Sequence, residues 1–436
     1  MTEARSPDRG ADAPPAASLA QDANTSVQNR KAPSAARPTL PVPAPEFIML
    51  VGALMALNAI AIDIMLPALG QIGAAFQVQN DNDRQLIVVA YVIGLGLPQL
   101  LFGPMSDRFG RRNMLLFSLI GYSIFGLLCV FAQTFEQLLL ARGLQGAAAA
   151  GARVAGHSIV RDVYSGRAMA RVLSFAMMVL MAAPIIAPGV GQLVLFVAGW
   201  RMIFLVLVIV GLGLFAWIFF RVPETLPAAA RRSIDVEAIA SAYKMVLTTR
   251  VTCGYMMASG VVFGCLFSFI SAAEQVFLEV YDLGASFTFY FAGVAIAMAA
   301  SSLMNANLVE RIGMRRLSHG ALIALALISV LNAALSMAGF DGLWVFFPLM
   351  ACTFFLFSLI GANFNALAME PLGDIAGTAA AAYGFVTTIL SGVLGAVVAR
   401  GFDGTTTPLL IGFTILSFVA LAIVFVTEKG RLFQAR

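Results

Sequence analysis

The sequence predicts an all-α polytopic membrane protein with 12 transmembrane helices, arranged as two pseudo-symmetric six-helix halves. First, 60% of its 436 residues are hydrophobic and only 11% are charged, whereas an average soluble protein carries roughly 25% charged residues. Second, apolar stretches of about 20 residues, the length that crosses the hydrocarbon core of a bilayer, recur along most of the chain. Third, one charged motif appears twice, at matching places in the chain. Together these features exclude a soluble globular protein.

Residues 1–44 precede the first apolar stretch. They are rich in Ala, Pro, Ser and Asp, so we expect a disordered cytoplasmic N-terminal tail. The tail lacks the apolar core of a signal peptide. Residues 45–221 then form the first predicted half, 222–250 a cytoplasmic linker, 251–428 the second half and 429–436 a short cytoplasmic C-terminal tail.

Twelve apolar stretches are long enough to span a bilayer. In the first half they lie at about 46–69, 85–105, 113–132, 137–160, 168–197 and 201–221. In the second half they lie at about 251–279, 285–308, 317–338, 342–367, 376–400 and 407–427. The later part of the linker, residues 233–247, mixes apolar and charged residues as a helix on a membrane surface does.

Basic residues gather on one side of the predicted bundle. If twelve spans alternate in direction, 22 of the 27 Lys and Arg residues fall on the side of both termini, and only Arg84, Arg201 and Arg400 fall on the other. Because cytoplasmic loops carry an excess of Lys and Arg, both termini are predicted to be cytoplasmic.

A six-residue motif follows both the second and the eighth span. Each copy has an acid, an arginine, an apolar residue, a glycine and then an arginine two positions later. The copies are Asp107-Arg108-Phe109-Gly110-Arg111-Arg112 and Glu310-Arg311-Ile312-Gly313-Met314-Arg315. The repeat indicates duplicated halves packed around a central cavity, as in transporters built from internal repeats.

The first copy of this motif is the candidate for a moving part. Gly103 would let helices approach closely, and Gly110 permits a tight turn between spans two and three. The charged residues can form an ion-pair cluster that joins helix ends in one conformation and releases them in another, which makes a gate. These residues are Asp107, Arg108, Arg111 and Arg112. The alternative is a turn whose arginines only fix topology.

The segment Gly103-Pro-Met-Ser-Asp107-Arg108-Phe-Gly110-Arg111-Arg112 resembles the signature loop of the major facilitator superfamily almost throughout. Further segments are similar to the bicyclomycin-resistance (Bcr/CflA) type of drug:proton antiporter. They are Asp63-Ile-Met-Leu-Pro67-Ala, Arg142-Gly-Leu-Gln145-Gly146, Val160-Arg161-Asp162-Val-Tyr164, Ala183-Pro184-Ile-Ile-Ala187-Pro188, Pro223-Glu-Thr-Leu-Pro227 and Ile375-Ala-Gly377-Thr378-Ala. The resemblance covers about residues 46–427.

This resemblance implies the major facilitator fold, a place in the bacterial inner membrane, and proton-coupled export of small amphipathic drugs or related compounds by alternating access. It also implies that Arg161 and Asp162 belong to the cytoplasmic gate.

The resemblance further implies that Pro184, Pro188 and Gly191 in span five seal the cavity against proton leak. The chain departs from the family pattern here, because Ala187 and Gln192 stand where glycines are usual. From its residues alone, span five also fits an ordinary kinked helix, since prolines remove backbone donors.

Charged side chains inside the predicted spans carry most weight for function, because each costs at least a few kcal/mol at the bilayer centre unless paired or hydrated. Asp63 lies in span one, Glu274 in span seven, and Arg142 and Arg153 in span four. The two arginines are about three helical turns apart and share a face, and His157 lies near it. Arg153 and His157 either line the cavity or snorkel towards the cytoplasmic surface.

Asp63 is the strongest candidate for proton coupling. Its short side chain sits on a helix that lines the cavity in this fold, so its carboxylate can take up and release a proton near neutral pH. Arg142 is a candidate counter-charge, and a static Asp63–Arg142 ion pair is the alternative. Glu274 is a second candidate proton carrier, or a binder of cationic substrates.

Several polar and aromatic residues are candidates for contact with a substrate in the cavity. They are Asn58, Tyr91, Arg153, Phe267, Phe269, Asn363, Asn365 and Tyr383. Most aromatic residues in membrane helices instead face lipid or neighbouring helices, so packing is the alternative for each.

The energy source and partners follow by elimination. No GxxxxGK[ST] phosphate loop occurs, so a proton gradient is expected and no cofactor. Four scattered cysteines and two distant histidines predict neither a disulfide nor a metal site. We expect a monomer that contacts a small-molecule substrate and the lipid bilayer, but no nucleic acid. A proton-coupled uptake symporter for a small metabolite is the first alternative function, and a membrane-embedded enzyme is a remote second.

Overall fold

The computed structural model describes residue 2 and residues 42–164, 166–227, 231 and 236–434. The predicted disordered tail, residues 1–44, therefore lies almost entirely outside the described residues. The chain divides into two units, Met1–Thr39 and Leu40–Arg436, and every described helix belongs to the second.

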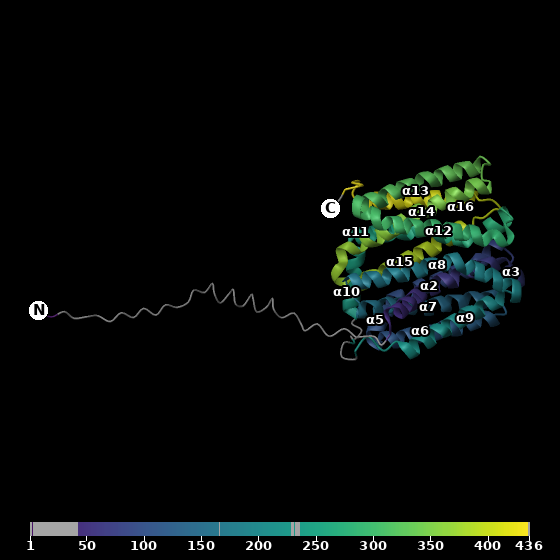
Figure 1. Ribbon diagram of the computed structural model, residues 1–436. Helices are drawn as coiled ribbons and strands as arrows, with labels where there is room; N and C mark the ends of the chain where they lie inside the picture. The colour runs from purple at the N-terminus through teal and green to yellow at the C-terminus, as the bar shows by residue number, and fades with distance from the viewer. Residues whose placement is uncertain (1, 3–41, 165, 228–230, 232–235, 435–436) are drawn as a thin grey trace. The chain divides into compact units, whose positions relative to one another are not determined.

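Long helices lie side by side in this second unit (Figure 1). The short turn Leu66–Ala68 joins α2 to α3 within the first predicted span. The first-half helices are α2 (Ala44–Asp63), α3 (Leu69–Ala75), α4 (Leu86–Gly96), α5 (Gln99–Phe109), α6 (Arg111–Phe131), α7 (Phe135–Val163), α8 (Gly166–Ala198) and α9 (Trp200–Arg221).

The second half begins after a shorter helix, α10 (Val236–Thr248). A π-helical turn, Gln275–Val280, extends α11. The second-half helices are α11 (Arg250–Glu274), α12 (Phe287–Ile312), α13 (Met314–Met337), α14 (Leu343–Met369), α15 (Ala376–Ala399) and α16 (Thr407–Thr427).

Each of the twelve predicted spans coincides with a helix or helix pair among the described residues. Ten helical segments there are long and apolar enough to cross a bilayer. Segments Asp81–Gly96 and Gln99–Phe109 form an eleventh candidate span bent by 46°, next to Pro98, which has no N–H to continue the helical ladder. The remaining helix, α7, has 29 residues but carries Arg142 and Arg153 among Gly and Ala, so its hydropathy is low.

Most helix packing lies within each half. In the first half α7 packs against α4 and α6, and α2 packs against α8; in the second half α11 packs against α15 and α16. Between the halves, α15 packs along α4 and α5, and α12 packs along α8. The bundle thus has two six-helix halves held together by related pairs of helices.

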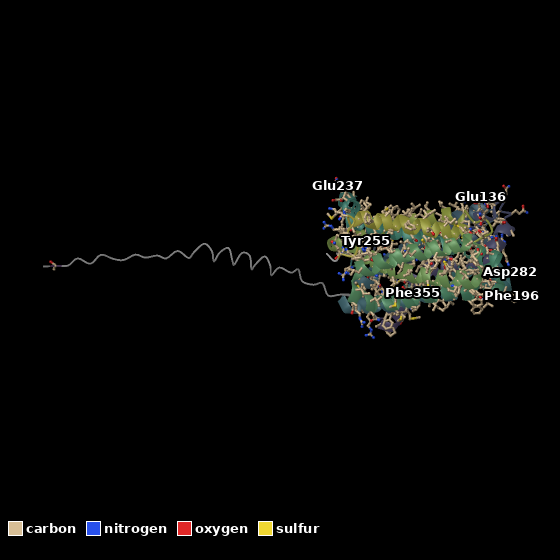
Figure 2. All side chains as sticks on the ribbon, turned by 90° about the horizontal axis from the view of Figure 1, so that it is seen from above. Glu136, Phe196, Glu237, Tyr255, Asp282 and Phe355 are labelled. Atoms are coloured by element: carbon tan, nitrogen blue, oxygen red, sulfur yellow. The ribbon has the colours of Figure 1, made fainter. Side chains whose placement is uncertain are left out.

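Large apolar side chains cover the outside of the bundle. Phe196 is 87% exposed and Trp344 is 81% exposed, and Figure 2 places Phe196 at the edge of the bundle. Soluble proteins rarely expose such a surface, but hydrocarbon accommodates it. The interior of the second half instead holds an aromatic cluster around Phe269, which contacts Phe277, Phe291 and Phe354.

The predicted sequence repeat is a repeated backbone turn. Gly110 joins α5 to α6 with φ 97° and ψ 148°, and Gly313 joins α12 to α13 with φ 86° and ψ 150°. Side chains other than hydrogen rarely tolerate this backbone region, so glycine is required at both turns. The same conformation at matching places supports the duplication inferred from the sequence.

Helix α10 belongs to the predicted surface-lying linker. Val246 is fully buried, whereas its neighbour Leu247 is 57% exposed. The Tyr243 hydroxyl donates to the Leu100 carbonyl oxygen at 3.0 Å. Since α10 also packs against α11 and α15, it connects the first half to the second at one end of the bundle.

Candidate functional site

Asp63 is the last residue of α2 and only 3% exposed. The helix ends there because Pro67, four residues later, has no N–H to donate to the Asp63 carbonyl. Within the described part of the chain, no hydrogen bond or ion pair reaches the Asp63 carboxylate. Its only electrostatic feature is burial, which makes the ionised form costly.

Arg142 lies beside this helix end but does not pair with Asp63. Its guanidinium donates to the Ala61 carbonyl at 3.1 Å and to the Gln145 side-chain oxygen at 2.7 Å, and it lies over the Tyr91 ring at 4.3 Å. The Ala61 carbonyl is one of the last four of α2, which a helix end leaves without helical partners. A static Asp63–Arg142 ion pair is therefore not present; Arg142 instead caps the end of α2.

Helix α8 touches the same helix end. Pro184 and Pro188 lie within α8, and a Cβ atom at Gly191 would sit 1.9 Å from the Ile64 carbonyl oxygen. No side chain larger than glycine fits at that distance. Gly191 thus brings α8 against the residue that follows Asp63. It lies in the same proline-containing segment of span five that the sequence analysis singled out.

Two ends of the bundle can be distinguished by charge. The basic end carries the two glycine turns, the linker and the C-terminus; the far end carries the connections near residues 76–85, 281–286 and 400–407. In Figure 2, Glu237 and Tyr255 lie at the basic end and Glu136 and Asp282 at the far end.

An ion-pair cluster occupies the basic end of the first half. Arg111 pairs with Asp107 and, at 3.2 Å, with Asp162, whose carboxylate also accepts from the Thr225 hydroxyl at 3.0 Å. The Arg111 backbone N–H donates to Glu224 at 2.8 Å. The cluster therefore joins α5, α6, α7 and the start of the linker around the Gly110 turn.

The other predicted gate residues have different surroundings. Arg112 donates to the Phe219 carbonyl at 2.8 Å, Arg108 lies over the Phe109 ring, and Arg161 contacts Ser158. A Cβ atom at Gly103 would meet no heavy atom within 4 Å. The expected close helix approach at Gly103 is thus absent from this conformation.

A related cluster occupies the second half. Arg315 pairs with Glu370 at 3.1 Å and with buried Glu428 at 3.3 Å. The Tyr255 hydroxyl donates to Glu428 at 2.7 Å and contacts the His319 Nε2 at 2.9 Å. The repeated glycine turn is therefore followed in both halves by an arginine that holds carboxylates from other helices.

The far end is sealed by polar contacts between the halves, which the sequence did not reveal. Arg84 pairs with Glu274 at 3.3 Å and with Glu279. Arg400 pairs with Asp83 at 2.5 Å. One feature of the sequence could have indicated these contacts: Arg84 and Arg400 are two of the three basic residues predicted on the side opposite the termini.

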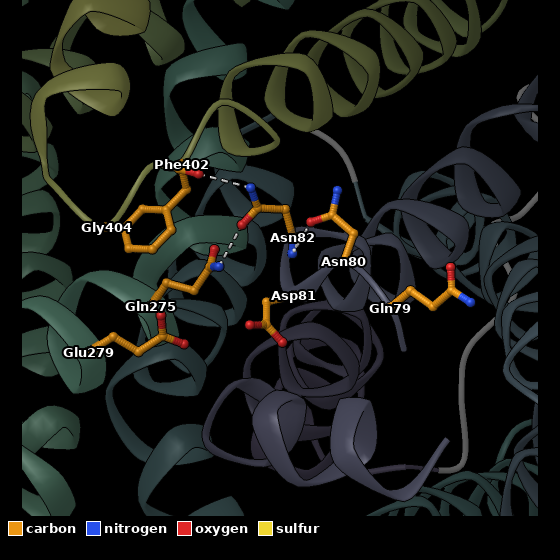
Figure 3. Close-up of a pocket in the computed structure, with 8 residues that line it drawn as sticks. All are labelled: Gln79, Asn80, Asp81, Asn82, Gln275, Glu279, Phe402 and Gly404. Atoms are coloured by element: carbon orange, nitrogen blue, oxygen red, sulfur yellow. Dashed lines mark hydrogen bonds between the residues drawn. The ribbon is translucent and has the colours of Figure 1, made fainter. Parts of the chain in front are cut away.

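Amide side chains complete this far-end seal. Asn82 accepts from Gln275 at 2.7 Å and donates to the Phe402 carbonyl at 2.9 Å, both across the halves (Figure 3). Gln85 also bonds Gln275, and both are nearly fully buried. The contacts border a pocket of about 460 Å³ that contains Asp81 and Glu279. Glu274 thus stands in an interhalf seal, paired with Arg84, and its role as a second candidate proton carrier or a binder of cationic substrates stays a prediction.

The candidate substrate-contacting residues divide into accessible and packed ones. Arg153 and Asn365 are exposed, and Asn58, Phe267 and Tyr383 are partly exposed.

The remaining candidates for substrate contact are buried among other side chains. Asn363 is buried and donates to Asn305 at 2.7 Å, and Phe269 is 1% exposed within the aromatic cluster. Tyr91 is fully buried and donates to Asn58 at 3.0 Å. In this conformation Phe269 is a core residue, not a lining one.

A family model for the Major Facilitator Superfamily matches residues 48–396. The chain belongs to this superfamily. It is 26% identical over 400 residues to a bicyclomycin resistance protein homolog of Haemophilus influenzae, covering 88% of this chain and 96% of that one. It is 25% identical over 364 residues to multidrug resistance protein D of Escherichia coli, covering 80% and 86% of the two chains.

The fold is also similar to the crystal structure of a bacterial homolog to the human lysosomal transporter Spinster, in an inward-facing and unoccupied conformation. The TM-score is 0.69 at 15% sequence identity, over 89% of this chain and 97% of that one. This major facilitator chain is accordingly a multi-pass membrane transporter and not an enzyme. Its bacterial relatives imply the inner membrane.

Proposed function

We propose that this transporter exports small amphipathic drugs or related compounds in exchange for protons, by alternating access. The observation that carries the proposal is Asp63, a buried carboxylate with no partner among the described residues, at a helix end contacted by Arg142 and Gly191. Its similarity to a bicyclomycin resistance protein homolog and to multidrug resistance protein D favours drugs as the cargo.

Asp63 supplies the coupling in this mechanism. Protonation removes its charge and the cost of burying it, so a protonated Asp63 is compatible with the closed packing around α2 and α8. An ionised Asp63 requires water or a bound group, which favours an opened, hydrated cavity. Proton and substrate then compete indirectly, because the protonated and ionised forms of Asp63 favour different conformations, and this links proton entry to substrate exit.

The two ends of the bundle supply the gates. With both termini in the cytoplasm, the far end faces the periplasm, and the contacts of Arg84, Asn82 and Arg400 close it. The ion-pair cluster around Arg111 then belongs to the cytoplasmic gate. Rocking of the halves breaks the far-end contacts and releases the substrate outward.

A proton gradient is sufficient to drive this exchange. One proton moving through about 200 mV provides about 4.6 kcal/mol, which supports a concentration ratio of roughly a thousandfold.

Transport into inside-out membrane vesicles tests the proposal. An acid vesicle interior should drive protein-dependent accumulation of a dansyl-labelled amphipathic probe, and a protonophore should abolish it. Vesicles carrying Asp63→Asn serve as the matched control. Accumulation that instead requires an alkaline interior would indicate proton-coupled uptake and contradict export.

A further inference from the structure

Three basic residues follow one another along α7 at four-residue steps. Arg153, His157 and Arg161 therefore lie on one helix face, each about 40° from the last. Leu144, which is 37% exposed, lies nine residues before Arg153 and so about half a turn away around the helix. Because Leu144 belongs to the outer apolar surface, the basic face points the other way, into the bundle.

Arg153 lies deep in the bundle and is still accessible. It stands ten residues before the end of α7, about 15 Å along the helix axis, yet its side chain is exposed. An accessible arginine so far from the helix end fits a position on the substrate path, not snorkelling to the surface.

No described carboxylate balances the charge of these arginines. Arg153 forms no ion pair among the described residues, and the Arg161 guanidinium donates to the Ser158 hydroxyl at 3.3 Å. The nearby Asp162 is held by Arg111 and Thr225. Uncompensated positive charge inside a membrane protein is expensive unless water or a ligand of opposite charge accompanies it.

His157 adds a directed polar atom to this face. Its Nδ1 lies 2.9 Å from the Arg153 carbonyl oxygen. A carbonyl only accepts, so Nδ1 carries the proton of this bond, and Nε2 stays available to another group. At the end of the row, the Arg161 guanidinium reaches towards Gly377 at the start of α15, in the other half.

We propose that the basic face of α7 binds the anionic group of the cargo, so that the preferred substrates are amphipathic anions such as lipophilic carboxylates. This assignment rests on the proposed export function and specifies its substrate class. The Arg153 guanidinium holds the carboxylate, and the apolar part of the compound lies among the partly exposed aromatic side chains of both halves, Phe267 and Tyr383 included.

Equilibrium binding to the purified full-length protein tests this assignment with three probes that share one fluorophore. Dansylglycine is an anion, its methyl ester is uncharged and dansylcadaverine is a cation. At pH 7 the protein should bind dansylglycine about tenfold to a hundredfold more tightly than the ester, which is the range of a charge-assisted hydrogen bond. Dansylcadaverine should bind most weakly.

Variants locate the preference. Arg153→Gln should reduce the dansylglycine-to-ester ratio to within about twofold of unity and leave ester binding unchanged. Arg153→Lys, which keeps the charge, should retain most of the preference. Arg250→Gln, an exposed arginine at the start of α11, is the matched control and should behave as wild type.

The assignment would be overturned if the wild-type protein bound dansylcadaverine as tightly as dansylglycine or more tightly. It would also be overturned by an unchanged anion preference in Arg153→Gln. The relative affinities of the wild-type protein for the three probes test the assignment even where a variant fails to fold. Competition with dansylglycine then distinguishes two kinds of anion: octanoate is a soluble carboxylate, and dihexanoyl phosphatidylglycerol is a lipid with an anionic headgroup. Failure of both to displace dansylglycine also contradicts the assignment.

Binding and transport fail separately. Anion preference without gradient-driven accumulation in vesicles would contradict the export mechanism but keep the anionic site. Gradient-driven accumulation of dansylcadaverine without anion preference would contradict the anionic site but keep the export mechanism.

Discussion

Asp63 and Arg142 are both buried, but they do not form an ion pair with each other. Arg142 donates hydrogen bonds to the Ala61 carbonyl and to Gln145. Its charge therefore stabilises the end of α2, and Asp63 is left unpaired. A carboxylate paired to an arginine would resist protonation, because the partner favours the charged form. An unpaired Asp63 is therefore consistent with the proton-coupling role proposed for it.

Asp63→Asn should abolish coupling and preserve the fold. Asparagine imitates the protonated carboxyl permanently, so the variant should insert normally but accumulate no probe in acid-interior vesicles. Its substrate affinity should lose the dependence on pH, up to tenfold per pH unit, that competition with one proton gives the wild type. Vesicle accumulation and probe binding between pH 6 and 8 measure both effects.

Asp282→Asn is the matched control, because Asp282 is an exposed carboxylate in a connection at the far end. It should transport as wild type. Gradient-driven export that survives Asp63→Asn but disappears in Glu274→Gln would place the proton carrier in the second half.

Helix α8 acts on the coupling residue through its packing. It contains two prolines and crosses α2 where the helix ends, with Gly191 against the Ile64 carbonyl. Close backbone contact of this kind requires glycine and leaves little space for water. The sealing role that the family resemblance assigns to this segment therefore has a defined position, one residue beyond Asp63.

Gly191→Ala should destabilise the protein and impair transport. The added methyl would overlap the Ile64 carbonyl and push α8 from α2, at a cost of about 1–3 kcal/mol, typical of overpacking. Thermal unfolding in detergent should show a lower midpoint than wild type. Gly189→Ala, two residues earlier, has no heavy atom within 4 Å of the new methyl and should match or slightly exceed wild-type stability. Equal midpoints for the two variants would show that the contact is not tight.

The whole molecule is held in this conformation by contacts that differ at its two ends. At the far end the bonds cross between the halves, through Arg84, Asn82 and Arg400. At the basic end, the Arg111 and Arg315 clusters each lie within one half or join it to the linker. Opening the far end therefore breaks interhalf bonds, including the buried Arg84–Glu274 pair, whereas each half can move as a unit.

A crosslink across the far end should lock the transporter. Asn82→Cys with Gln275→Cys, in a background whose four cysteines are replaced, should be joined by a short bis-methanethiosulfonate reagent, which forms a reducible disulfide with each thiol, because the native side chains bond at 2.7 Å. The crosslinked protein should lose vesicle transport, and reductive cleavage of the reagent should restore it. The pair Ser302→Cys and Ser358→Cys, bonded within the second half at 2.8 Å, should crosslink without loss. Transport by the crosslinked Asn82–Gln275 pair would show that these residues need not separate.

The orientation of the molecule rests on its charge distribution. Because 22 of 27 basic residues lie on the side of the termini in the predicted topology, that side should face the cytoplasm. Reporter fusions within residues 222–250 should be active as cytoplasmic fusions, and fusions at the connection near Asp282 as periplasmic ones. The opposite pattern would reverse the direction proposed for transport.

Hydropathy and turn chemistry were enough to predict the positions of the helices, the duplicated turns at Gly110 and Gly313, and the burial of Asp63. Each of these depends on residues close together in the chain: an apolar stretch must be helical in hydrocarbon, and the backbone angles of these two turns require glycine.

Side-chain pairing was not predictable in the same way. The sequence suggested Arg142 as partner of Asp63, a close contact at Gly103 and a substrate-contacting Phe269. The fold instead gives Arg142 to the Ala61 carbonyl, open space to Gly103 and an aromatic core to Phe269, and it pairs Glu274 with Arg84. These outcomes depend on the rotation and axial offset of helices far apart in sequence. Periodicity identifies residues that share a face of one helix, but the facing side chain on another helix is set only when the helices pack.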